Sequence, residues 1–240
     1  MQANPLQARL ARRLRWQQEA HVLEKKDLVL KTMLPKLRVW QANRLQNSFA
    51  HFMADPKKRP AAEFFLTDLY GDADFMQRDA EAARILPVMS RLLPENLLIA
   101  AVDAIELSVL SHALDMRMAR TLARIKTDSG ALTEQDYCKA YRLVGMRRLR
   151  QQQIDLVMDV GSRLDAVVKK HGIARLLSAS RLPARMLGLQ HLQSFLERGF
   201  RAFNHLGGAK SFLNAIHRQE SVISRRLLAG QAEPFKPPFS

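Results

Sequence analysis

The sequence predicts an all-α fold, a bundle of about seven to nine helices with long central helices and no sheet. Helix-capping and helix-breaking residues recur along the chain at distances typical of helices. No hairpin dipeptide stands between alternating runs, and no stretch keeps a sustained period of two. The 240 residues are 47% hydrophobic with only 10 Gly and 10 Pro, and this composition excludes a disordered or collagen-like chain.

Capping residues, prolines and glycines mark the helices of the first half. Thr32 can cap a helix whose first turn holds Pro35. Asp74 and Gln77, three residues apart, form a capping-box pattern. The expected elements are, in order, a basic helix over 5–31, a helix from Thr32 to Asp55, a short helix that Pro60 opens and Gly71 closes, and a helix that begins at Asp74 and kinks or ends at Pro87.

The second half reads in the same way. Thr133 and Asp136 repeat the capping-box spacing, and Gly172 is a stop signal. The expected helices run from Pro94 to Ile125, from Thr133 to His171 over up to about 38 residues, from Ser180 to Gly207, and from Ala209 to Leu228. Within the long one, a three-four spacing predicts packing against a neighbouring helix at a shallow angle, through Ile154, Val157, Gly161, Leu164 and Val168.

Three regions are expected: a basic N-terminal helix (1–31), a single helical domain (32–229) and a flexible Pro-rich tail (230–240). The net charge is +15, with +9 over residues 1–60, −7 over 61–115 and +13 over 116–240. An acidic middle between basic flanks can mean attraction between packed helices, so the net charge overstates the free basic surface.

The sequence predicts a cytoplasmic protein without a membrane span. Residues 97–114 are mostly apolar, yet they contain Asp103, Glu106 and His112, which indicates a buried helix. The single cysteine, Cys138, excludes a disulfide scaffold and favours a reducing compartment. Residues 2–16 are Arg-rich and free of acids, which resembles an organellar presequence, but a basic solvated helix face is the preferred interpretation.

The acidic residues of the central helix are the first candidate site. Asp103 and Glu106 lie about 60° apart on a helix, with Arg117 in the same sector. They could serve proton transfer or a metal, or they could form a buried ion-pair network with arginines such as Arg78, Arg84 or Arg117, which is the preferred interpretation. His112 projects about 180° from Asp103, so one ligand cannot bind all three.

Residues 64–71 read FFLTDLYG and resemble the signature of the FFLEELYG motif proteins, with Thr67 and Asp68 where that name has two glutamates. The resemblance implies a helical bacterial protein of unknown activity. Physically, the stretch is either a turn-and-core motif that fixes two helices, which we prefer, or part of a ligand site. Together with the acidic helix, it gives one candidate polar cluster: Asp68, Tyr70, Arg78, Asp79, Asp103, Glu106 and Arg117.

No cofactor, metal or catalytic residue is expected. The chain contains no Glu-x-x-His pair, zinc-ligand spacing, nucleophile elbow, phosphate-binding glycine loop or dinucleotide fingerprint. Cys138 lies in an expected first helical turn, where the pKa of its thiol could fall, but a lone thiol is more often a packing residue.

Two basic segments are candidates for anion binding. RLARRLR at 9–15 and RLVGMRRLR at 142–150 mix arginines with leucines, as helices on phosphate backbones do, and they also fit ordinary amphipathic helices. The candidate residues are Arg9, Arg12, Arg13, Arg142, Arg147 and Arg150.

Three function classes therefore stay open. The preferred one is a non-catalytic partner-binding or scaffold protein whose protein partner carries an acidic surface. The second is a binder of nucleic acid, without sequence preference, or of another anionic surface. The third is a small-molecule enzyme built on the acidic residues of the central helix. The sequence leaves the oligomeric state open.

Overall fold

The all-α prediction is confirmed by the computed structural model, which describes residues 5–69, 81, 84, 95–126 and 130–239. Every regular element in these ranges is a helix, and seven of the helices have at least eleven residues. The elements are α1 (Pro5–Lys26), α2 (Leu28–Ser48), α3 (Ala50–Met53), α4 (Arg59–Phe64), the π-helix η1 (Phe65–Leu69), α6 (Glu95–Ile125), α7 (Glu134–Val144), α8 (Arg147–Val168), α9 (Ile173–Ala179), α10 (Arg181–Met186), α11 (Gln190–Leu206) and α12 (Lys210–Ala229).

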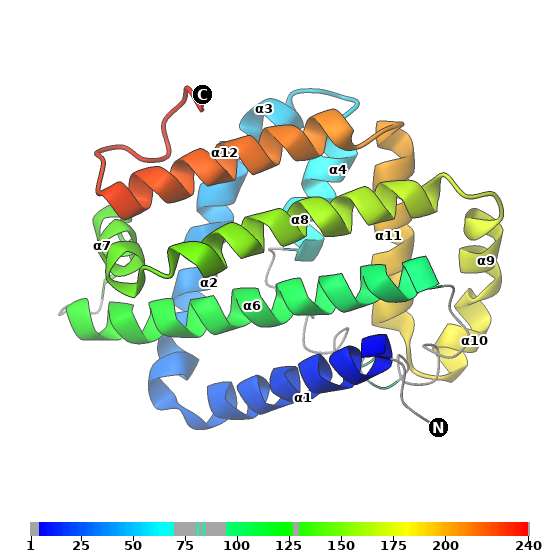
Figure 1. Cartoon of the computed structure of the whole chain (residues 1–240), viewed down its shortest axis with the longest axis horizontal. Helices are drawn as coiled ribbons and strands as arrows, with labels where there is room; N and C mark the ends of the chain where they lie inside the picture. The colour runs from blue at the N-terminus through cyan, green and yellow to red at the C-terminus, as the bar shows by residue number, and fades with distance from the viewer. Residues whose placement is uncertain (1–4, 70–80, 82–83, 85–94, 127–129, 240) are drawn as a thin grey trace.

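The long helices form two layers (Figure 1). In the front layer α1, α6, α8 and α12 lie side by side, and each contacts the next. Behind them α2, α4 and α11 run across this layer, with α2 against α6 and α11 against α8 and α4. The helix α7 contacts the ends of α6 and α12 at one side of the molecule. The bundle therefore places α8 between α6 and α12.

Several predicted helix boundaries are confirmed. The helix expected from Pro94 to Ile125 corresponds to α6. Thr133 caps α7 in a complete capping box with Asp136, as the spacing predicts. The left-handed Gly172 (φ 89°) separates α8 from α9, and α12 lies within one residue of its expected bounds.

Three boundaries were predicted wrongly. The second helix begins at Leu28, because the Asp27 carboxylate accepts hydrogen bonds from the backbone N–H groups of Val29 and Leu30. Thr32 and Pro35 therefore lie inside α2. The helix expected from Thr133 to His171 is broken by Gly145 (φ 63°) and Met146 (φ 55°) into α7 and α8. The helix expected from Ser180 is likewise divided at Gly188 (φ 63°).

The core has two clusters of buried side chains. One is rich in phenylalanine and joins α2, α3, α4, η1, α8, α11 and α12, with Phe49, Phe52, Phe65, Phe203 and Phe212 almost fully buried. The other lies where α2, α6, α7 and α12 meet, and its most buried members are Leu30, Leu34, Leu37, Met118, Ala119, Leu122 and Ala140. Phe64 and Phe65 of the FFLTDLYG segment belong to the first cluster, whereas Tyr70 and Gly71 lie outside the described residues.

The packing of α8 against α12 depends on a small residue. A methyl group placed on Gly161 of α8 would lie 2.5 Å from Leu213 Cδ2 of α12. The tail beyond Gly230, expected to be flexible, lies against the bundle, since Arg226 donates hydrogen bonds to the carbonyl oxygens of Lys236 and Pro238. Phe235 packs with Trp40 and Tyr137. In the part of the chain that the structure describes, no helix is long and apolar enough to cross a membrane.

Candidate functional site

The two acids of the central helix face arginines. Asp103 and Glu106 are each 6% exposed on α6, on the side toward α1 and α8. Arg13 of α1 donates to Glu106 at 3.0 Å, and Arg9, one turn earlier on α1, donates to the same carboxylate. The third cation comes from α8, where Arg163 donates to Asp103 at 2.9 Å. The pair is therefore compensated by three cations from two other helices.

This cluster draws on sequence regions that are far apart. The partners considered from the sequence are placed elsewhere: Arg84 donates to the carbonyl oxygens of Leu187 and Gly188, and Arg117 contacts the Met146 sulfur. Arg78 lies outside the described residues. The basic flanks thus supply Arg9, Arg13 and Arg163 to the acidic middle of the chain, which reduces the free positive charge of the surface.

Asp68, a further member of the candidate polar cluster, lies apart from the acids of α6. Asp68 is buried near the end of η1 and pairs with Arg198 of α11, whose Nε donates a hydrogen bond to it at 2.7 Å and whose Nη2 lies 2.5 Å from the same carboxylate. Thr67 donates to the same carboxylate at 2.9 Å. Tyr70 and Asp79 lie outside the described residues. In the described chain, Asp68 therefore takes part in a contact between η1 and α11, apart from the acids of α6.

A second polar network lies on α6, one to three turns beyond Glu106. Asp115 accepts a hydrogen bond from the Gln41 amide of α2 at 3.0 Å. His112 lies 3.5 Å from Arg38 and from Glu24. Burial raises the pKa of the Asp115 carboxyl above its ordinary value of 3.8, although Gln41 and the positive charges of Arg150, Arg38 and His112 act in the opposite direction.

The raised pKa of Asp115 predicts a pH dependence of stability. A carboxyl with a raised pKa in the folded state stabilises the fold below its unfolded pKa, and this contribution is lost as the pH rises through the folded pKa. Asp115→Asn, which stays neutral and can still accept from Gln41, should therefore unfold at higher urea than the parent at neutral pH. Urea titrations between about pH 4 and pH 7 should show the difference growing with pH. Asp159→Asn, the same change at an exposed position, is the control, and an equal gain there would contradict the assignment to Asp115.

The six arginines of the two basic segments have different environments. Arg9 and Arg13 bind Glu106, whereas Arg12 is exposed. Arg142 is exposed and its guanidinium lies against Gly230 at the end of α12. Arg150 is 5% exposed and stacks on the Tyr141 ring at 4.5 Å. Arg147 of the second segment is exposed and lines a hollow.

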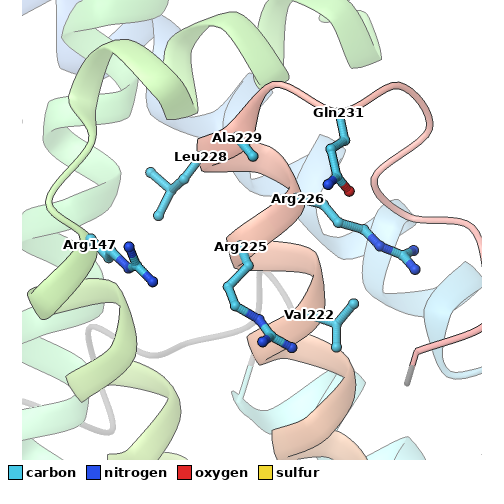
Figure 2. Close-up of a pocket in the computed structure, with 7 residues that line it drawn as sticks. All are labelled: Arg147, Val222, Arg225, Arg226, Leu228, Ala229 and Gln231. Carbon is cyan, nitrogen blue, oxygen red and sulfur yellow. The ribbon is translucent and has the colours of Figure 1, made fainter.

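That hollow lies between the start of α8 and the end of α12 and has a volume of about 550 Å³. Figure 2 shows its lining residues, with Arg147 extending from α8 toward α12. The lining combines three arginines with aliphatic side chains and one amide: Arg147, Val222, Arg225, Arg226, Leu228, Ala229 and Gln231. Among the described residues, Arg147 and Arg225 have no ion-pair partner, whereas Arg226 binds the tail.

A second hollow of about 480 Å³ continues along the same two helices and shares Arg225 with the first. We call the two hollows together the α8–α12 groove. Arg218, Arg225 and Arg226 are not among the residues predicted from the sequence. The spacing of Arg218 and Arg225 does indicate a shared face, because residues seven apart lie on the same side of a helix. The sequence does not indicate that α8 is the helix opposite that face.

The comparisons with known proteins identify a family but no activity. No group of His, Cys, Asp and Glu suited to a metal ion occurs among the residues whose placement is described. Neither a curated protein nor a solved structure matches the chain. A family model does match residues 20–234, a range that contains both helices of the groove and the acids of α6. The chain therefore belongs to the family described as Domain of unknown function (DUF8198).

Proposed function

We propose that this chain is a non-catalytic binding protein that docks an acidic, amphipathic segment of a protein partner in the α8–α12 groove. The observation that carries the proposal is the pair Arg147 and Arg225, two exposed cations on facing helices with no ion-pair partner in the described chain. Other arginines of the basic flanks are already compensated, as Arg9, Arg13 and Arg163 are by the acids of α6. Complementary charge on a partner would supply orientation and a high association rate.

Apolar surface beside these cations favours a protein partner over a nucleic acid. Val222 and Leu228 line the hollow, and two apolar side chains close in sequence to Arg147 are exposed: Leu143 in the last turn of α7 by 62%, and Met146, which directly precedes Arg147, by 37%. Such a surface suits a helix with acids on one face and leucines on the other. None of the described lining residues is a phenylalanine, tyrosine or tryptophan, and the one imidazole, that of His217, is bound to Asp155, so the groove favours a protein segment over stacked bases.

Binding of a labelled helical peptide with this pattern tests the proposal by fluorescence anisotropy. In the variant Arg147→Gln/Arg225→Gln the Kd of the peptide should rise by about tenfold, because charge-assisted contacts are lost at two positions. The matched control is Arg12→Gln/Arg175→Gln, which removes the same charge from exposed positions on α1 and α9. The Kd of the peptide for this control variant should stay within about twofold of the value for the parent, because exposed charges outside the groove contribute little to binding.

Duplex DNA of equal charge provides the decisive comparison. Tighter binding of DNA than of the peptide, with a log–log salt slope of about −0.9 per neutralised phosphate, would favour the nucleic-acid class instead. Failure of the peptide to bind the parent protein, or equal losses in both double variants, would also contradict docking in the groove.

A further inference from the structure

The second hollow of the α8–α12 groove gathers hydrogen-bond donors from two helices. Its described lining residues are Gln151 of α8 and, on α12, Asn214, His217, Arg218, Ser221 and Arg225. The positions 214, 218, 221 and 225 follow one another at steps of four, three and four residues, so they lie along one face of α12. The hollow is therefore lined by a row of polar side chains that faces α8.

The charge of this hollow is positive. Arg218 and Arg225 are exposed and have no ion-pair partner among the described residues. The nearby carboxylate is Asp155 of α8, which binds His217 at 2.9 Å and accepts a hydrogen bond from Gln151 at 2.9 Å. Asp155 thus orients two of the lining side chains and leaves both guanidinium groups available to an anion.

Ser221 provides a second, independent observation. Its hydroxyl oxygen is buried, and in the described chain it has no hydrogen-bond partner. Buried hydroxyl groups are nearly always paired with protein or with an ordered molecule, so this one calls for a partner. Ser221 lines the hollow between Arg218 and Arg225, and rotation about its Cα–Cβ bond would bring the shielded hydroxyl to a ligand oxygen there.

We propose that this hollow binds a phosphate monoester, presented as a phosphorylated side chain of the acidic partner. The inference rests on the proposed docking function and specifies the group recognised. A phosphate monoester carries about −1.5 to −2 charges at pH 7 and three strong acceptor oxygens. Two guanidinium groups, a hydroxyl and the Asn214 amide offer more donors than the two oxygens of a carboxylate can use.

A pair of otherwise identical acidic helical peptides, one with serine and one with phosphoserine, tests the inference by calorimetry. The phosphoserine peptide should bind the parent protein about tenfold more tightly than the serine peptide. That ratio should fall to about one in Arg218→Gln and should also fall in Ser221→Ala, a change small enough to leave the fold intact. In Arg175→Gln, an equal loss of charge on α9, the ratio should stay at its parent value.

The outcomes separate this inference from the proposed function. Equal binding of the two peptides by the parent overturns the phosphate site and leaves docking intact. If neither peptide binds but inorganic phosphate binds saturably in an Arg218-dependent way, the docking function fails and the hollow is a site for a free phosphate compound. An equal fall of the ratio in Arg175→Gln shows unspecific charge attraction and overturns the inference.

Discussion

Glu106→Ala should lower the free energy of unfolding by about 2–3 kcal/mol. Removing one partner of a fully buried ion pair costs about 3–5 kcal/mol, because the other charge stays buried. Here the side chains of Arg9 and Arg13 are 38% and 21% exposed, so solvent compensates part of the loss. Urea unfolding followed by circular dichroism measures the effect. Glu63→Ala on α4 is the exposed control, expected to change stability by less than about 0.5 kcal/mol.

A double-mutant cycle with Arg13→Ala isolates the interaction of the Arg13–Glu106 pair. The two changes together should cost less than the sum of the single changes, since neither then leaves the other charge without its partner. Parent-like unfolding of Glu106→Ala would contradict a structural role for the pair and would favour the enzyme interpretation of the acids.

The individual helices were more accessible to sequence analysis than their junctions. Thr133 and Asp136 are three residues apart, so the cap of α7 is a local property that spacing alone reveals. The start of α2 depends on a choice between two capping residues, Asp27 and Thr32, and local pattern does not rank them. At the α7–α8 break Gly145 (φ 63°) is a stop signal that the sequence contains, whereas the positive φ of Met146 (55°), which a non-glycine residue rarely adopts, leaves no such signal.

For the acid pair, too, the sequence predicts the helix that carries the residues but not their partners from other helices. The sequence placed Asp103 and Glu106 on one helix and required cations to compensate them, because buried carboxylates are costly. It could not select Arg9, Arg13 and Arg163, which lie 60 to 97 residues away from the acids they bind. The α8–α12 groove was inaccessible for the same reason, since it exists only once two helices are paired.

Gly161→Val should separate α8 from α12 and cost about 2–3 kcal/mol of stability. Even a methyl group at this position meets Leu213 Cδ2 at 2.5 Å and Cδ1 at 2.9 Å, and overpacking of this kind costs about 1–3 kcal/mol. The valine side chain adds two further methyl groups to that Cβ atom, which increases the overlap with Leu213. Ala166→Val, an exposed change on the same helix, controls for the helix propensity of valine and should cost less than about 1 kcal/mol.

Substitution of Leu213 tests whether the loss of stability in Gly161→Val comes from this contact. Leu213→Ala alone should destabilise the protein by about 2–5 kcal/mol through a cavity, but in the Gly161→Val background the added valine fills part of that space. The double variant should therefore be more stable than the sum of the two losses predicts. Because the two helices carry Arg147 and Arg225, Gly161→Val should also weaken binding of the acidic peptide in the proposed groove, whereas Ala166→Val should not. Additive losses, or unchanged peptide binding in a folded Gly161→Val protein, would show that the groove does not depend on this close approach of α8 and α12.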